Sequence, residues 1–228
     1  MTVVIALGGS VVVPESGTLQ AAKHANQIEQ ASSVGRPLCV VVGGGATARS
    51  YIAAGREANL AESTLDRLGI AASRLNARLL ANILSESLNP VFVTDYEEAI
   101  EVHDDGGLPV MGGTTPGQTT DAVAAVLAED VGANLVVYGT STDGVYSADP
   151  EMNDDATRHD VLSHAELVEL LADGSRGAGT SAPVGLLAAK LLERSETDAV
   201  VIDARDQQSL SEALRGEEVD GTLIQTDG

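Results

Sequence analysis

The sequence predicts an α/β fold with a mostly parallel central sheet covered by helices on both faces. Short valine-rich apolar runs alternate with helical patterns along the 228-residue chain. The run 38–42 is continuously apolar, as expected for a strand buried on both faces of a parallel sheet. Glycine or hydroxyl clusters follow several of these runs, at 8–10, 43–45, 112–120 and 139–142. These clusters are expected to meet at one edge of the sheet, where ligands bind in such folds.

The N-terminal elements follow from β-branched runs and from apolar residues at helical spacing. Pro37 marks the break after the first long helix, and Pro90 the break after the longest helical pattern. We therefore expect strands at 3–7, 38–42, 91–94 and 108–111, and helices at 18–33, 46–58, 65–86, 96–102 and 122–131.

The C-terminal half continues the alternation with shorter elements. We expect strands at 135–138, 199–202 and 222–225, and helices at 165–172, 184–194 and 207–214. Asp143-Gly144 between β-forming residues predicts a hairpin. The acidic run 149–160 predicts an exposed loop, and the glycine-rich run 174–179 a mobile one.

The chain is strongly acidic, with a formal net charge of −21. A protein that tracks a nucleic-acid backbone needs a basic face, so we expect no nucleic-acid partner. The acidic residues are dispersed, and only two of the 13 basic residues are lysines. Because salt screens the self-repulsion of such a charge, we interpret this composition as adaptation to high salt.

The single cysteine, Cys39, lies in the apolar run 38–42 and is expected to be an inert core residue. One cysteine excludes an internal disulfide and a multi-cysteine metal site. No apolar run approaches ~20 residues, and the sequence opens without the basic region of a signal peptide. We expect a cytoplasmic protein without a membrane span. The four histidines are scattered, mostly beside acids, and are expected at the surface.

The stretch 112–125 is the densest run of small and hydroxyl residues in the chain. It follows an expected strand and opens an expected helix, whose free N–H groups and dipole favour an anion. Asp121 falls in the first turn of that helix. It could cap the helix, or the loop before it could hold a phosphate-bearing substrate.

Other nucleotide-binding patterns are absent or weak. The P-loop pattern does not occur. Gly43-x-Gly45-x-x-Ala48 fits the looser dinucleotide fingerprint, but Asp66 precedes a helix instead of ending the next strand.

Two cations have both a structural and a functional interpretation. Arg49 is either an exposed helix arginine or a phosphate contact. Lys190, in an Ala- and Leu-rich helix, either extends along an apolar surface or places a point charge on a transferring phosphoryl group.

Five motifs, in order and spacing, resemble archaeal-type uridylate (UMP) kinases of the amino acid kinase superfamily. The resemblance covers essentially the whole chain. It rests on Gly8-Gly9-Ser10, Val41–Gly45 with Ala48-Arg49, Asp66, Gly112–Ala125, and Thr142–Tyr146 with Ala148-Asp149-Pro150.

The resemblance implies a three-layer αβα sandwich, amino acid kinase-like. A single domain, 1–228, would comprise an acceptor-binding lobe (about 1–130) and an ATP-binding lobe (about 131–228). It also implies the reaction Mg-ATP + UMP → UDP + ADP in pyrimidine nucleotide biosynthesis, and a homohexamer. Mg²⁺ would accompany ATP, and the resemblance assigns no metal-ligating residue in the chain.

The resemblance also assigns residues by position. The UMP site would comprise Gly44, Asp66, Thr114, Thr115, Pro116, Gly117, Gln118, Thr119 and Thr120. The ATP site would comprise Gly9, Ser10, Gly45, Arg49, Thr140, Tyr146 and Asp149. Asp121 would orient catalytic groups, and Lys190 matches the lysine of the C-terminal half.

The chain departs from its relatives at two positions. Many superfamily members have a charged residue, often lysine, near the position of Ala6, and the family often has a lysine at the position of Ala46. Two rival hypotheses stay open, the second because of the missing first-strand cation. One is a kinase of another small acceptor, such as an amino acid, carbamate or isopentenyl phosphate, and the other is a non-catalytic nucleotide-binding or storage protein.

Overall fold

The computed structural model describes residues 1–14, 20–32, 35–150, 152–174 and 183–226. Its centre is an eight-stranded sheet with the order β3-β4-β2-β1-β5-β7-β8-β6. All neighbouring strands are parallel except β7 and β8, which are antiparallel. The strands are β1 (Val3–Leu7), β2 (Leu38–Val42), β3 (Pro90–Val93), β4 (Leu108–Met111), β5 (Leu135–Thr140), β6 (Val161–Ser163), β7 (Asp198–Asp203) and β8 (Gly221–Gln225).

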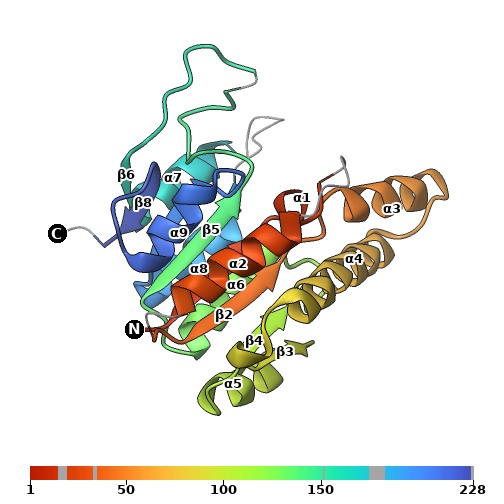
Figure 1. Ribbon diagram of the computed structural model, residues 1–228. Coiled ribbons are helices and arrows are strands. Elements are labelled where there is room, and N and C mark those ends of the chain that lie inside the picture. Colours follow the sequence, from red (N-terminus) through yellow and green to blue (C-terminus); the bar gives the residue numbers. More distant parts are fainter. Residues whose placement is uncertain (15–19, 33–34, 151, 175–182, 227–228) are drawn as a thin grey trace.

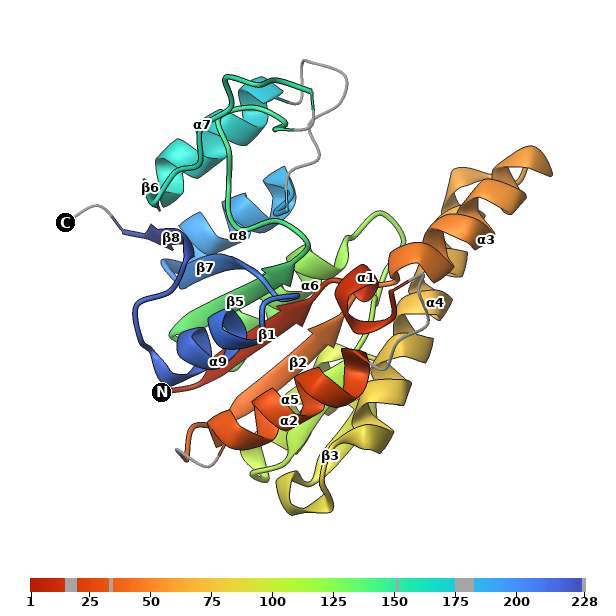
Figure 2. The ribbon, with the colours of Figure 1, turned by 45° about the horizontal axis from the view of Figure 1, so that its top comes forward.

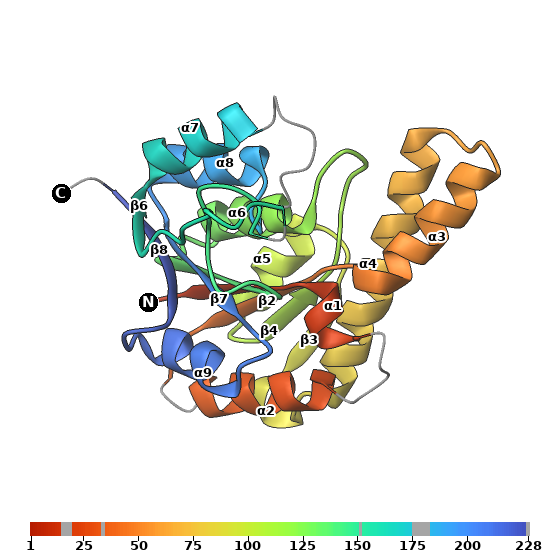
Figure 3. The same ribbon diagram turned by 90° about the horizontal axis from the view of Figure 1, so that it is seen from above.

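Helices cover both faces of this sheet, which confirms the predicted α/β fold (Figures 1 and 3). On one face lie α5 (Tyr96–Asp104), α6 (Thr120–Asp130), α7 (His164–Gly174) and α8 (Leu186–Ser195). On the other lie α1 (Gly9–Val12), α2 (Gln20–Ser32), α4 (Glu62–Ile83) and α9 (Gln207–Arg215). A 3₁₀ turn, η1 (Glu86–Leu88), follows α4.

Alternate residues of the central strands pack into two separate hydrophobic cores, one on each face of the sheet. In β1, Val4 and Ala6 pack against the α5–α8 layer, whereas Val3, Ile5 and Leu7 pack against the opposite layer. This is the period-two alternation of a strand buried on both faces.

Helix α3 (Gly45–Glu57) packs against α4, and the pair projects beyond the sheet (Figure 2). The C-terminal part of α4 is buried on the sheet through Ala77, Leu80 and Ala81. One helix therefore joins the core to the projecting arm.

Every expected strand and helix is present, with small shifts at the ends, but the sequence missed α1 and β6. The predicted hairpin at Asp143-Gly144 is wrong. Tyr146 pairs instead with Arg158 in an isolated bridge. The chain between these two residues is too long for the two-residue turn that Asp143-Gly144 predicts. The expected mobile run lies, from 175 to 179, outside the described residues.

Buried polar side chains correct the expectation that all histidines lie at the surface. His24 is 3% exposed and bonds Gln27 Oε1 and Val11 O, each at 3.1 Å. His164 is 5% exposed and bonds Thr197 O at 2.9 Å. Both rings find hydrogen-bond partners that the tertiary fold brings near, which a sequence pattern does not reveal.

Cys39 is a free, buried cysteine, as predicted, and burial raises the pKa of its thiol to about 12. Among the described helices, none is both long and apolar enough to cross a membrane.

Candidate active site

Helix α4 fastens the β4–α6 loop, residues 112–119, through two side chains on one face. Asp66 Oδ2 accepts a hydrogen bond from the backbone N–H of Gly117 at 2.9 Å. Two turns further on, Ser73 Oγ accepts one from the N–H of Gly113 at 2.8 Å. Residues seven apart share a helix face, so both bonds hold the same loop against α4.

The same helix fastens the glycine loop after β2. Asn76 Nδ2 donates to Gly43 O at 2.9 Å and to Gly44 O at 3.2 Å, and the side chain is 3% exposed. A Cβ on Gly44 would lie 3.3 Å from the carbonyl oxygen of Gly69 on α4. Helix α4 thus sets the spacing between the two loops that follow β2 and β4.

A cavity of about 210 Å³, here called the acceptor cavity, lies between α3, α4 and the β4–α6 loop. It is lined by Gly44, Ala48, Ile52, Asp66, Gly69, Ile70, Ser73, Gly113, Gln118, Thr119 and Thr120. The lining thus includes Gly44, Asp66, Gln118, Thr119 and Thr120 of the residues that we expected to bind UMP. The other expected residues, Thr114, Thr115, Pro116 and Gly117, belong to the loop without lining the cavity.

The loops after β1 and β2 touch through their glycines. A Cβ on Gly9 would lie 2.3 Å from both Gly43 O and Gly45 N, a distance that no side chain tolerates. Gly45 has a φ of +58°, in the left-handed region that favours glycine. These glycines allow the two backbones to approach as closely as they do. Arg49, exposed on α3, donates to Ser10 Oγ at 3.2 and 3.3 Å across the same junction.

A second cavity of about 230 Å³, here called the central cavity, adjoins the first. It is lined by Ala6, Leu7, Gly8, Val41, Thr119, Thr120, Asp121, Tyr138, Thr140, Pro183 and Gly185. Thr119 and Thr120 line both cavities. Two ligands bound in these cavities would therefore meet at the N-terminus of α6.

Asp121 joins two helix N-termini. It lies in the first turn of α6, and its Oδ2 accepts a hydrogen bond at 2.6 Å from the N–H of Gly185, the N-cap residue of α8. Asp121 thus accepts from a helix N-terminus, as the capping interpretation expects, but that N-terminus belongs to α8 and not to α6. An acid between two positive helix ends is electrostatically stabilised.

Tyr146 is held by a carboxylate in the long connection between β5 and β6. Its hydroxyl donates to Asp143 Oδ1 at 2.8 Å, and this bond raises the pKa of Tyr146. Arg158 Nη1 in turn donates to Asp143 Oδ2 at 3.1 Å. Of the expected ATP-binding residues in this half, Thr140 lines the central cavity, whereas Tyr146 and Asp149 line neither cavity.

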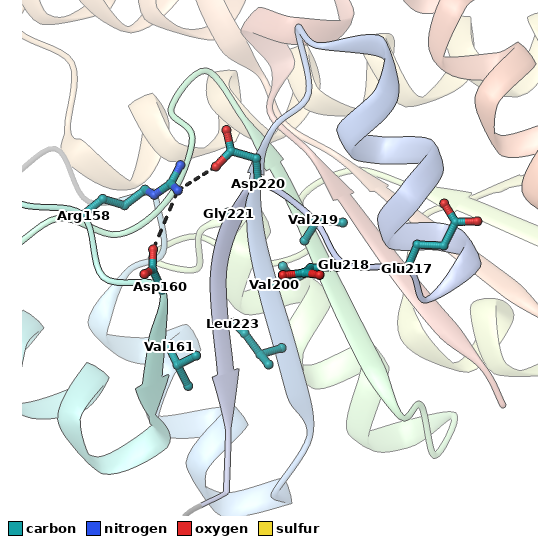
Figure 4. A pocket seen from close by; sticks show the side chains of 10 residues that line it. All are labelled: Arg158, Asp160, Val161, Val200, Glu217, Glu218, Val219, Asp220, Gly221 and Leu223. Atoms are coloured by element: carbon teal, nitrogen blue, oxygen red, sulfur yellow. Dashed lines mark ion pairs between the residues drawn. The ribbon is translucent and has the colours of Figure 1, made fainter.

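Arg158 also borders a larger open hollow of about 720 Å³ on the β6-β8-β7 part of the sheet (Figure 4). Its guanidinium lies 2.6 Å from Asp220 and 3.8 Å from Asp160. Glu217 and Glu218 add further negative charge to the lining. The hollow contains none of the residues expected in the UMP or ATP sites.

Comparison with known proteins places this geometry in a family. The pattern of the Amino acid kinase family matches residues 1–203. The chain belongs to the amino acid kinase family.

Within that family, the chain is similar along its whole length to proteins named uridylate kinase. It is 46% identical over 224 residues to the uridylate kinase of Haloarcula marismortui, covering 98% of each chain. The uridylate kinase of Halorubrum lacusprofundi is 47% identical over 227 residues, with 99% of this chain and 94% of that protein covered. The resemblance seen in the sequence is thereby confirmed.

Solved structures of proteins with these names share the fold of this chain. The crystal structure of uridylate kinase from Archaeoglobus fulgidus matches with a TM-score of 0.85 and 42% identity, covering 98% of this chain and all of that one. UMP kinase from Bacillus anthracis matches with a TM-score of 0.82 at 20% identity, covering 100% and 96%, and supports the fold alone.

In this amino acid kinase, one of the two positions that lack an expected cation faces the candidate site. Ala6 lines the central cavity, so the position that is often lysine in the superfamily does face that space. Ala46 lies in the first turn of α3. Lys190, on α8, is exposed and lines neither cavity. The structure thus brings Asp121, but not Lys190, to the wall of the central cavity.

Sequence reasoning missed the residues that hold the loops in place. Ser73 and Asn76 had no motif, although both are polar positions within the otherwise largely apolar inner face of α4. Their spacing from Asp66, by two and nearly three turns, was the available signal. The contact between Asp121 and Gly185 joins residues 64 positions apart and left no local pattern.

Proposed function

We propose that this protein is a UMP kinase, which transfers the γ-phosphoryl group of Mg-ATP to UMP and yields UDP and ADP in pyrimidine nucleotide biosynthesis. The observation that carries the proposal is the shared wall of the two cavities at Thr119 and Thr120. Phosphoryl transfer depends chiefly on positioning and charge stabilisation, which such a junction favours. The relatives named uridylate kinase support the same acceptor.

The acceptor cavity would hold UMP. Its phosphate would lie at Gly44 and at the N-termini of α3 and α6, where free N–H groups and the helix dipoles favour an anion. Asp66 would accept hydrogen bonds from the ribose hydroxyls. The loop comprising Thr114, Thr115, Pro116, Gly117, Gln118, Thr119 and Thr120 would enclose the rest of the nucleotide.

The donor would approach from the side of the central cavity. We assign ATP binding to Gly9, Ser10, Gly45, Arg49, Thr140, Tyr146 and Asp149. Asp121 would orient the groups that meet between the cavities, and Lys190 would supply positive charge to the transferring phosphoryl group. Because Lys190 is exposed, this role requires the lysine to extend from α8 toward bound ATP.

Magnesium would arrive with ATP, because Mg²⁺ is commonly held by substrate phosphates and one or two carboxylates. Among the described residues, no group of three or more His, Cys, Asp or Glu could hold a metal ion. Asp121 suits an accessory contact, since Gly185 uses only Oδ2 of a carboxylate that lines the central cavity. When bound, the ion would neutralise phosphate charge.

We further propose an acceptor lobe at about 1–130 and an ATP lobe at about 131–228. All residues that line the acceptor cavity fall in the first of these ranges.

We also propose a cytoplasmic homohexamer. Exposed apolar side chains on α3, on α4 and between the two helices support assembly, since exposed apolar patches commonly mark interfaces. They are Tyr51, Leu60, Leu75 and Leu79, between 43% and 62% exposed.

Adaptation to high salt remains part of the proposal. The net charge of −21 and relatives from halophilic hosts support it. Melting temperature measured from low to molar KCl should rise with salt, and maximal stability at low salt would contradict the proposal.

The proposed reaction is tested by measuring ADP release with Mg-ATP in high KCl across UMP, CMP, carbamate and glutamate. UMP should give the highest kcat/KM. Turnover of carbamate or glutamate in preference to UMP would favour a different small-acceptor kinase. Nucleotide binding without any turnover would favour the non-catalytic alternative.

A further inference from the structure

Gln118 is held by two hydroxyl groups at the wall of the acceptor cavity. Its Oε1 accepts a hydrogen bond from Thr114 Oγ1 at 2.8 Å and from Tyr96 Oη at 3.1 Å. Thr114 belongs to the same loop, whereas Tyr96 is the first residue of α5. The side chain is therefore fixed from two different elements.

This arrangement decides which end of the amide can act on a ligand. Both hydroxyl protons are directed at the amide oxygen, so the bonds to Thr114 and Tyr96 leave both Nε2 hydrogens unused. Burial is the main reason that the pKa of Tyr96 is raised, and its hydroxyl therefore stays protonated as a donor at neutral pH. Gln118 lines the acceptor cavity, so Nε2 is the atom of this amide that remains available to donate to a nucleotide bound there.

The two common pyrimidine bases differ at the position that such a donor can distinguish. Uracil has a carbonyl oxygen at C4, which accepts a hydrogen bond. Cytosine has an amino group there, which would place a donor against a donor. A site that hydrogen-bonds one group discriminates strongly against an analogue that leaves its buried polar atoms unpaired.

We propose that Gln118 selects UMP over CMP by donating from Nε2 to the C4 carbonyl of uracil, with Tyr96 and Thr114 as positioning residues that fix the orientation of the amide. This inference rests on the proposed UMP kinase function. It adds the atom that discriminates the base and the two hydroxyl groups that orient it.

The test measures kcat/KM for UMP and CMP at saturating Mg-ATP, together with dissociation constants for both nucleotides by calorimetry. In Gln118→Glu, one oxygen can still accept from the two hydroxyls while the other accepts from an amino group. The UMP-to-CMP ratio should fall by about 10- to 100-fold, as expected for exchanging a donor for a charged acceptor. Far-UV circular dichroism establishes that the variant folds.

Tyr96→Phe provides a second variant, which removes one positioning bond without touching the base. Loss of one hydrogen bond predicts a fall of about 2- to 10-fold in the same ratio, with KM for ATP unchanged. Tyr51→Phe removes an exposed tyrosine hydroxyl on α3 and should leave the ratio unchanged. If Gln118→Glu does not fold, the Tyr96→Phe result decides.

The outcomes separate the two levels of the argument. If the wild type uses UMP but both variants retain its UMP-to-CMP ratio, or lose activity with both nucleotides equally, the selection role is wrong and the UMP kinase function stands. A wild type that binds UMP and CMP equally well also overturns the selection role. A wild type that neither binds nor phosphorylates UMP rejects the proposed function and this inference with it.

Discussion

Replacing Asn76 by leucine should loosen the glycine loop after β2. The wild-type amide donates to Gly43 O and Gly44 O from a side chain that is 3% exposed. Leucine keeps the branched shape but cannot donate, and because it is bulkier than asparagine, crowding at this buried site adds to the loss of the donor. Gly44 O keeps a hydrogen bond at 3.2 Å from the N–H of Ala48, so the loss falls mainly on Gly43 O.

The size of the effect follows from that one buried carbonyl. An unsatisfied buried hydrogen-bonding group costs about 1–3 kcal/mol. For a chain of this length, each kcal/mol lowers Tm by about 2–4 °C, so the expected decrease is about 2–12 °C. Because the loop forms part of the acceptor cavity, KM for UMP should rise more than KM for ATP.

The assay combines thermal unfolding, followed by circular dichroism, with steady-state kinetics in both substrates. Asn82→Leu is the matched control. Asn82 lies on the same helix, but its side chain is exposed and bonds only Arg78 O, so its loss should cost less than about 0.5 kcal/mol. A Tm for Asn76→Leu equal to that of the control, with an unchanged KM for UMP, would refute the reasoning.

Three other changes test the charged and titrating groups. Asp121→Asn should lower kcat while keeping the dissociation constant for UMP, because an amide oxygen can still accept from Gly185; loss of folding would support a purely structural role. Lys190→Ala should lower kcat by about 10²–10³ with unchanged Tm, because the lysine is exposed, and a kcat near that of the wild type would reject its role. His24 has a pKa lowered chiefly by burial, so below about pH 6.5 the unfolded state binds a proton that the folded state resists. The free energy of unfolding should therefore fall from pH 7 to pH 5, and His24→Gln should reduce that slope; an equal slope in both proteins would contradict the assignment.

The fold was predictable because its strands are continuous apolar runs. The runs 3–7 and 38–42 are buried along their entire length. A strand buried on both faces is apolar at every position, so it can be recognised without an alternation of apolar and polar residues. The short elements were not predictable. Strand β6 has three residues after an acidic connection, and α1 is a single turn containing two valines, which favour strands.

The candidate site was predictable only in part. The glycine and threonine loops are visible as local motifs, and the family resemblance assigned Gly44, Thr119 and Thr120 to the expected UMP site; all three line the acceptor cavity. The side chains that hold those loops, such as Ser73 and Asn76, act across packed elements. Their partners are set by the tertiary fold, and a single sequence does not record such pairs.

The central claim, that UMP occupies the cavity beside α4, is tested most directly by filling that cavity. Gly69 lines it, and a Cβ there would meet only Ile52 Cδ1, at 3.4 Å. Glycine is unfavourable within a helix by roughly 0.5–1 kcal/mol relative to alanine, so Gly69→Ala should fold at least as stably as the wild type. Gly69→Leu would extend a side chain into the space proposed for the nucleotide.

The decisive measurement is the dissociation constant of UMP for Gly69→Leu by calorimetry, with Gly69→Ala and the wild type beside it. We predict that UMP binding to the leucine variant weakens by at least about tenfold, or roughly 1.4 kcal/mol, while ATP binding is retained. A folded Gly69→Leu protein that binds UMP as tightly as the wild type would contradict the account.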